Sequence, residues 1–183
     1  MKTLTLCFVM VAVLFGQQTF AQEKTVMVGG AAMYPSKNII ENAVNSKDHT
    51  TLVAAVKAAG LVETLSGPDP FTVFAPTNKA FDKLPKGTVE TLVKSENKAT
   101  LTGILTYHVV SGKMSAEDLM KAIKDGGGKA TLTTVAGGTL SAMQKGKKIV
   151  LTDAKGNTAM VTIADVFQSN GVIHVIDTVL MPN

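Results

Sequence analysis

The chain has 183 residues, 45% of them hydrophobic and 17% charged, so it can bury one sizeable core and does not have the composition of a disordered chain. Its formal net charge is only +4, and all 18 basic residues are Lys. Because Arg is the usual side chain for bidentate recognition of phosphates and bases, this composition argues against nucleic-acid binding.

The N-terminal residues predict a signal peptide at residues 1–21. Lys2 gives a positive start, an uncharged apolar run covers residues 4–15, and small residues at Thr19 and Ala21 fit cleavage after Ala21. The apolar run is too short to span a bilayer well, so we expect no transmembrane segment in the mature chain. Cleavage would also remove Cys7, the only cysteine, and leave no disulfide. We therefore expect a secreted, periplasmic or cell-surface protein.

Residues 22–35 are expected to extend across the surface ahead of a single domain at residues 36–183. Helical patterns dominate the first half of that domain, because residues that can cap a helix precede apolar residues at helical spacing. The predicted helices are one capped by Asp48 and ended by Gly60, one capped by Thr77 and running through Leu84, one around Leu101 to Leu105 that leads to His108, and one that opens at a Ser115–Asp118 box and ends at Gly126 to Gly128.

Short strand-forming runs follow, separated by turn residues. They cover residues 130–135, 138–143, 148–152, 158–166 and 171–180. Asn170-Gly171 is typical of a hairpin with a type I′ turn, which needs positive φ at both central residues. Helices followed by a meander of strands indicate an α+β fold.

The last strand-forming run is apolar on both faces except at His174, Asp177 and Thr178. We therefore expect it to lie in the centre of the sheet or between layers. Asp177 would share a face with Ile173 and Val175, where a carboxylate is costly unless backbone N–H groups or a cation satisfy it. Such partners are expected for Asp177.

Three motifs carry a resemblance to a known family. The first is Thr72-Val73-Phe74-Ala75-Pro76-Thr77-Asn78 followed by Ala80-Phe81, the central one is Tyr107-His108-Val109, and the second box is Asn170-Gly171-Val172-Ile173-His174-Val175-Ile176-Asp177 followed by Val179-Leu180-Met181-Pro182. In this order and spacing they resemble the signature boxes of the fasciclin domain. The resemblance covers roughly residues 38–182, and we call the motifs the first, central and second box.

The resemblance implies a wedge-shaped β-sandwich flanked by several α-helices. It also implies a secreted or surface location and a non-enzymatic role in cell–cell or cell–matrix contact, without a cofactor or metal. The partner would be an extracellular or cell-envelope protein or polysaccharide, and the chain is expected to be a monomer. In animal members the Tyr-His region has been linked to integrin binding. Here Ile176-Asp177 stands near the second box in place of the Asp-Ile pair of those members.

The predicted partner-binding residues are Tyr107, His108, Ile176 and Asp177. For the central box the alternative is a buried pair that holds backbone groups. The other box residues are predicted to be structural, and they are Phe74, Pro76, Thr77, Asn78, Phe81, Asn170, Gly171, His174 and, in a second role, Asp177. A surface patch and a structural role therefore both remain open for the boxes.

A lysine cluster is predicted at a hairpin turn, formed by Lys145, Lys147 and Lys148. Charged side chains in a turn commonly do no more than keep that turn in contact with water. Its functional interpretation is contact with an acidic polysaccharide or an anionic lipid surface, weakened by salt.

Catalytic and metal-binding patterns are weak in this sequence. His174 and Asp177 are three residues apart on a strand, so their side chains would point to opposite faces. No Gly-x-Ser-x-Gly elbow and no His-x-x-x-His pair occurs. A hydrolase that pairs Ser111 with His108 is one alternative function. The other is a carrier or sensor whose pocket, between helices and sandwich and lined by Met and Leu, holds a small apolar ligand.

Overall fold

The structure, a computed structural model, describes residues 24–182, and the predicted signal peptide lies outside them. The strands are β1 (Val26–Val28), β2 (Ala31–Met33), β3 (Phe71–Pro76), β4 (Val109–Ser111), β5 (Lys129–Thr133), β6 (Thr139–Lys145), β7 (Lys148–Thr152), β8 (Thr158–Gln168) and β9 (Gly171–Ile176). The helices are α1 (Ile39–Ala43), α2 (Thr50–Ala59), α3 (Val62–Ser66), α4 (Asn78–Phe81), α5 (Thr88–Leu92), the 3-10 helix η1 (Ser95–Asn97), α6 (Lys98–Tyr107) and α7 (Ala116–Asp125).

A seven-stranded sheet with the strand order β4-β3-β9-β8-β7-β6-β5 forms the centre of the molecule. β3 and β9 run parallel, and the other neighbours are antiparallel. The long strand β8 has two register shifts, which bend it so that it serves both halves of the sheet. A bridge between Val110 and Thr134 brings the two ends of the sheet together. The sheet therefore packs against itself as a wedge-shaped sandwich, and the predicted α+β class is confirmed.

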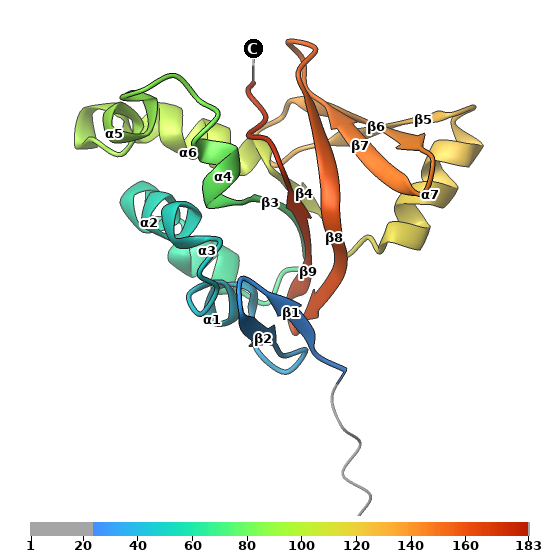
Figure 1. The fold of residues 1–183 in the computed structure, drawn as a ribbon, viewed down its shortest axis with the longest axis horizontal. Helices are drawn as coiled ribbons and strands as arrows, with labels where there is room; N and C mark the ends of the chain where they lie inside the picture. Colours follow the sequence, from blue (N-terminus) through green and yellow to red (C-terminus); the bar gives the residue numbers. More distant parts are fainter. Residues whose placement is uncertain (1–23, 183) are drawn as a thin grey trace, which may run out of the picture.

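The helices lie on two sides of this sheet. Figure 1 shows α1 to α6 gathered beside β3 and β9, while α7 covers the opposite end near β5 and β6. The sheet separates two apolar cores, one under α1, α2 and α6 and one inside the sandwich. All six residues of β9 are buried, with β3 on one side and β8 on the other. This confirms the predicted central position of the last strand, although the strand ends at Ile176.

Local capping signals placed the starts of two helices correctly, although α4 ends at Phe81, short of the predicted end at Leu84. The Thr77 hydroxyl accepts a hydrogen bond from the Ala80 N–H at the start of α4. Ser115 and Asp118 form the predicted capping box of α7. The predicted Asp48 cap is wrong by one residue, because His49 is the N-cap of α2 and offers no side-chain hydrogen bond there.

The prediction for residues 22–35 is wrong where they form the hairpin β1–β2. Val28 and Met33 are buried in the core on the helical side instead of crossing the surface. The turn of this hairpin rests against the segment before α2, since the Lys47 N–H donates to the Gly29 carbonyl at 3.1 Å. The hairpin therefore closes one side of the helical core.

The type I′ prediction for Asn170-Gly171 is also wrong, although the β8–β9 hairpin exists. Gly171 is the first residue of β9 and pairs with Gln168, and neither Asn170 nor Gly171 has a positive φ. Gly171 serves a different purpose, because a Cβ there would lie 2.3 Å from the Phe71 carbonyl oxygen. Its missing side chain allows β3 and β9 to pair.

Candidate functional site

The central box lies in the interior. Tyr107 is 1% exposed and His108 is 3% exposed. The Tyr107 hydroxyl donates to the Thr139 carbonyl at 2.8 Å and accepts from the Ala154 N–H at 3.2 Å, so it joins α6 to the start of β6 and to the β7–β8 connection. The box thus holds backbone groups, as its alternative interpretation states. Direct partner contact by these two side chains stays a prediction that would require the region to open.

His108 has both ring nitrogens engaged. Nε2 accepts from the Leu180 N–H at 3.0 Å, so the proton lies on Nδ1, which donates to the Ile104 carbonyl at 2.8 Å. Burial lowers the pKa of His108 to about 4, against smaller opposite effects of the Ile104 carbonyl and the Asp153 carboxylate. The ring is therefore neutral at pH 7. Because Nε2 is occupied by Leu180, the proposed Ser111–His108 pairing does not form.

Asn170 and His174 of the second box form hydrogen bonds that connect different elements of the fold. The Asn170 amide accepts from the Ile39 N–H at 3.0 Å and donates to the Leu65 and Gly67 carbonyls, so it joins α1 and α3 to the β8–β9 turn. His174 is fully buried, and its Nε2 donates to the Met114 carbonyl at 2.9 Å. Burial lowers its pKa, against weaker effects of Met114 and Asp165. Both side chains act within the fold.

The first box packs and caps the same region. Phe74 is fully buried, and its ring stacks on His174 with centroids 5.7 Å apart. Pro76, the last residue of β3, pairs with Ile176, and Phe81 packs in the helical core. Asn78 caps α2 from outside that helix, because its Oδ1 accepts from the Thr51 N–H at 3.0 Å. The box therefore sets where β3 ends and where two helices begin.

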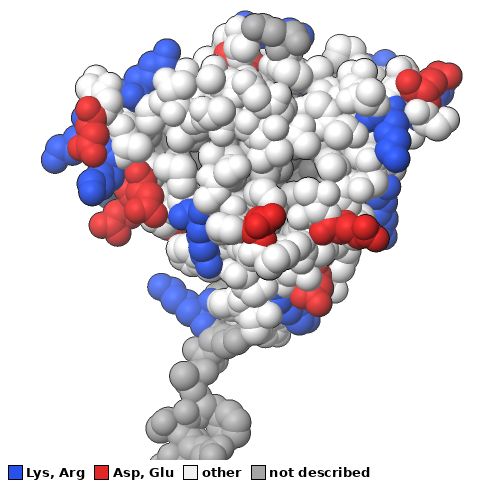
Figure 2. Space-filling model, turned by 180° about the vertical axis from the view of Figure 1, so that it is seen from behind, with Lys and Arg blue, Asp and Glu red and all other residues white. Residues whose placement is uncertain are grey.

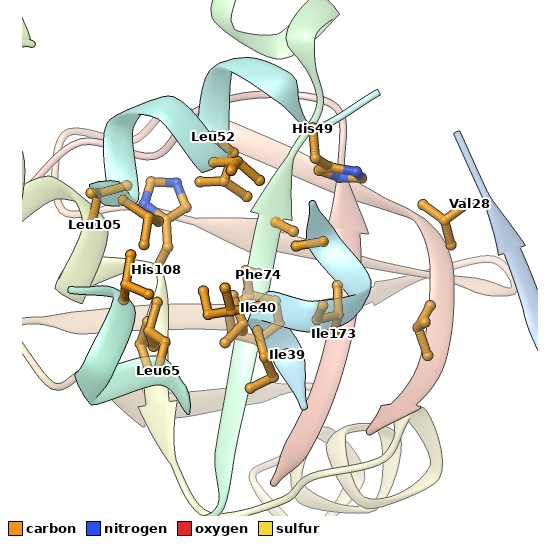
Figure 3. A pocket seen from close by; sticks show the side chains of 18 of the residues that line it. Val28, Ile39, Ile40, His49, Leu52, Leu65, Phe74, Leu105, His108 and Ile173 are labelled. Carbon is orange, nitrogen blue, oxygen red and sulfur yellow. The ribbon is translucent and has the colours of Figure 1, made fainter. Parts of the chain in front are cut away.

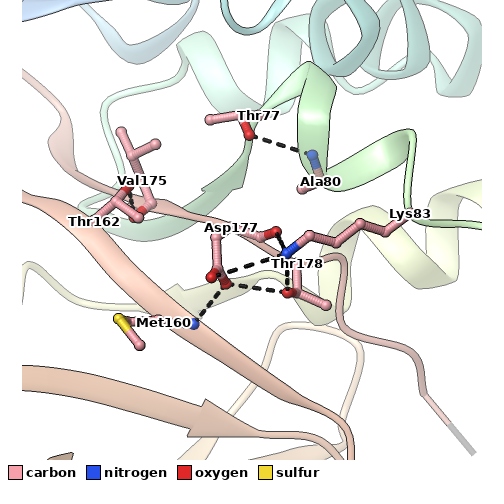
Figure 4. Close-up of polar contacts among 8 residues, drawn as sticks. All are labelled: Thr77, Ala80, Lys83, Met160, Thr162, Val175, Asp177 and Thr178. Atoms are coloured by element: carbon pink, nitrogen blue, oxygen red, sulfur yellow. Dashed lines mark hydrogen bonds and ion pairs between the residues drawn. The ribbon is translucent and has the colours of Figure 1, made fainter.

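Ile176 and Asp177 differ in exposure. Ile176 is fully buried, whereas Asp177 lies just after β9 and is half-exposed. Figure 4 shows the Asp177 carboxylate accepting from the Met160 N–H at 2.8 Å and from the Thr178 hydroxyl, with the Lys83 ammonium 3.9 Å away. The expected backbone and cationic partners are therefore present. The expected shared face with Ile173 is absent, because the strand ends first.

The lysine cluster of Lys145, Lys147 and Lys148 lies at the β6–β7 hairpin, and all three residues are exposed. Gly146 turns the chain there with φ +63°. None of the ion pairs within residues 24–182 involves these lysines. They are thus free to meet an anionic partner.

Asp153 is a buried anchor that the sequence reasoning missed. Its carboxylate accepts from the Lys155, Asn157 and Met181 N–H groups and from the Asn157 amide. Burial raises the pKa of Asp153, but these hydrogen bonds outweigh it and lower the pKa overall. The Asp-x-x-Gly-Asn turn pattern is the local signal that indicates such a residue.

Asp165 was missed for a different reason. It lies in the bulged part of β8 with φ 58°, the only positive φ outside glycine within residues 24–182. Its Oδ1 accepts from the Ala116 N–H at 2.7 Å, in the first turn of α7. The contact joins positions 49 residues apart, so no local pattern reveals it.

We expect Asp165→Ala to lower the free energy of unfolding by about 2 kcal/mol, since it removes this acceptor and leaves a side chain with a Cβ at positive φ without local compensation. Asp165→Asn keeps an oxygen acceptor and a residue type that tolerates this φ, so its loss should stay below about 1 kcal/mol. Urea denaturation of both variants measures the difference. Equal losses would contradict the assigned role.

An apolar cavity lies between the helices and the sheet, with a volume of about 50 Å³. Figure 3 shows Leu52 from α2, Leu105 from α6 and Ile40 from α1 around the same space. The position matches the predicted small-ligand pocket, but the lining is mainly Val, Ile and Leu, with Met33 the one methionine. A cavity therefore exists where the carrier hypothesis needs it.

His49 supplies a polar atom in the cavity wall. It is 3% exposed, its Nδ1 bonds the Ser46 hydroxyl at 2.9 Å, and its Nε2 has no hydrogen-bond partner within residues 24–182. Burial lowers the pKa of His49, opposed by weaker effects of the Ala75 carbonyl and Asp48. The ring is accordingly neutral at pH 7.

No group of three or more His, Cys, Asp or Glu that could hold a metal occurs in the part of the chain that the structure describes. Within the same residues, none of the helices has the length and hydropathy needed to cross a membrane.

Comparison with known proteins gives consistent matches. The model of the fasciclin domain matches residues 47–182. Protein sll1483 of Synechocystis sp. is 48% identical over 160 residues, 87% of this chain and 82% of that protein. The cell surface glycolipoprotein MPB83 of Mycobacterium bovis is 33% identical over 172 residues, 91% of this chain and 70% of that protein.

A solved structure shares the fold at low sequence identity. It is a FAS1 domain pair from the insect cell adhesion molecule Fasciclin I, with a TM-score of 0.73, 20% identity, and coverage of 81% of this chain and 52% of that chain. The order of the boxes, the wedge-shaped sheet and the family match agree. The chain belongs to the fasciclin domain family.

Proposed function

We propose that this chain is a non-enzymatic binding module that works outside the cytoplasm, secreted or at the cell surface, in cell–cell or cell–matrix contact. Its partner would be an extracellular or cell-envelope protein or polysaccharide. One observation carries the proposal: the box residues bond to and pack against other parts of the same domain. Partner binding would therefore fall to the outer surface of a rigid domain.

The named relatives support the location and the role. MPB83 is a cell surface glycolipoprotein, and Fasciclin I is an insect cell adhesion molecule. A signal peptide at residues 1–21 would bring this chain to the same side of the membrane.

The chemistry of the interior supports a role without catalysis. The two nitrogens of His108 and the two of His174 bond to backbone groups or accept from them. A general base must be able to reach a substrate proton, and rings held in this way do not.

The distribution of charge supports a contact surface. Figure 2 shows charged side chains at the two sides and across the lower part of one face, with a wide area in its upper middle free of Lys, Asp and Glu. The lysine cluster adds a separate basic site at the β6–β7 hairpin. We expect the uncharged surface to give contacts that resist salt and the cluster to give contacts that salt weakens.

Adhesion of protein-coated beads to envelope material and to acidic polysaccharide, measured in a salt series, tests this proposal. The variant Lys145→Gln/Lys147→Gln/Lys148→Gln should lose most of the salt-sensitive binding to polysaccharide, because three positive charges leave one turn. The matched control Lys79→Gln/Lys86→Gln/Lys94→Gln removes the same charge from other exposed positions and should bind normally. If both triple variants lost binding equally, the effect would come from net charge and not from the position of the lysine cluster. If the unmodified protein did not adhere at all, the proposed function would be contradicted.

A further inference from the structure

We propose that the apolar cavity binds a short-chain alkyl carboxylate, with the chain inside the cavity and the carboxylate at its mouth beside Lys57. The inference is independent of the adhesion role. It rests on three features of the cavity, which are its wall, its opening and the charge at that opening.

The wall fits an alkyl chain. The lining side chains are apolar except for His49, His108 and Lys57. Both nitrogens of His108 are engaged, so among residues 24–182 His49 Nε2 is the one ring nitrogen of the wall without a well-formed hydrogen bond, and the nearby Ala75 carbonyl raises the pKa of that ring. One polar atom is too few for a stable water, which needs two to four polar partners, so the cavity favours apolar contents.

The opening lies between three helices. The lining residues that are partly or fully exposed share this place, and they are Ile40 and Ala43 of α1, Val53 and Lys57 of α2, and Val62 of α3. Val53 and Lys57 are four residues apart and therefore lie on one face of α2. The hairpin β1–β2 closes another side with Val28 and Met33. A ligand would thus enter beside α2.

The charge at the mouth selects the ligand class. Among residues 24–182, Lys57 is the one charged side chain that lines the cavity. Its ammonium has no ion pair or side-chain hydrogen bond within residues 24–182. A carboxylate at this point would pair with Lys57 and keep contact with water, so it avoids the cost of burying a charge. An alkyl amine would meet repulsion at the same place.

The volume limits the chain length. A cavity of about 50 Å³ is about three to five times the 10–15 Å³ of space that admits one water, so it holds a chain of only a few carbons. Butanoate to hexanoate therefore match the cavity in the described conformation, whereas a long fatty acid would need the helices to separate.

Methyl NMR of the purified protein, titrated with hexanoate, tests the proposal. We expect saturable shifts of methyl groups at Leu52, Val56 and Ile173, and none with acetate, which has the charge without the chain. 1-Hexanol should also produce shifts at these methyl groups. Absence of saturable shifts with hexanoate would overturn the proposal.

Two variants separate the charge from the cavity. Lys57→Gln should weaken hexanoate binding about threefold, the effect of one exposed ion pair, and leave 1-hexanol unchanged. Lys94→Gln, the matched control, should change neither. Ala43→Leu should abolish binding of both ligands by filling the mouth, with the fold checked by circular dichroism. If Lys57→Gln and Lys94→Gln affect hexanoate equally, the carboxylate assignment is wrong.

Discussion

Gly171→Ala is expected to lower the free energy of unfolding by about 3 kcal/mol, because the added Cβ overpacks a site that cannot yield. That atom would lie 2.3 Å from the Phe71 carbonyl oxygen and 2.9 Å from Ile39 Cδ1. Phe71 is the direct partner of Gly171 in the parallel β3–β9 pairing. The oxygen can move only if the pairing at the centre of the sheet is disturbed. Urea denaturation measures the loss.

Gly103→Ala is the matched control. Gly103 lies within α6, and a Cβ there meets no atom within 4 Å. Alanine favours a helix interior over glycine, so we expect this variant to gain about 0.5–1 kcal/mol. The same substitution should therefore have opposite signs at the two positions. If Gly171→Ala proved no more destabilising than Gly103→Ala, the close approach of β3 and β9 would be contradicted.

Acidification from pH 7 to pH 4 is expected to destabilise the protein strongly. Burial holds the pKa of His108 at about 4, below the usual 6.5. The unfolded chain therefore binds more protons than the folded one in this window, and stability falls as pH falls. At about 1.4 kcal/mol per pKa unit, His108 alone accounts for about 3 kcal/mol. Burial also lowers the pKa values of His49 and His174, which adds to the same trend.

Urea denaturation between pH 7.5 and pH 4 measures this slope, and NMR of the imidazole nitrogens assigns it. His108 should remain neutral with its proton on Nδ1 until about pH 4. The lowered pKa of Asp153 contributes in a separate window, since its stabilisation is lost only as pH falls below the usual carboxyl value of 3.8. Titration of His108 near pH 6.5, or a flat stability profile, would contradict the buried and satisfied ring.

The elements predicted from sequence are those with complete local signals. The Ser115–Asp118 capping box and the Thr77 cap each lie within three residues of the groups they bond. The apolar run of β9 marked it as a strand buried on both faces. In each case the information lies in a few consecutive residues. The three boxes, taken together, also indicate the family and its fold.

The missed features depend on contacts between distant residues. Asn78 caps α2 from 27 residues away, whereas the sequence pattern favours the nearby Asp48, because such a pattern covers only neighbouring residues. The helices α1 and α3 have five residues each, too few to produce a helical period. The mouth of the cavity lies between these two helices and α2, so its lining and the place of Lys57 could not be predicted.

The interior position of the central box also depends on tertiary structure. The sequence of the box fits either a surface patch or a buried pair, because an aromatic residue beside a titratable one occurs in both settings. Bonds from His108 to Ile104 and Leu180 decide its surroundings. The Leu180 contact joins positions 72 residues apart, which sequence patterns do not reveal.

Affinity capture from the native cell envelope and extracellular matrix, with the purified protein as bait, tests the binding-module account most directly. We predict a specific protein or polysaccharide that remains bound at moderate salt and binds again when both components are purified. Retention should persist in the triple Gln variant of the lysine cluster, because the uncharged surface would carry it. Capture that disappears at moderate salt, or no reproducible partner, would contradict the account.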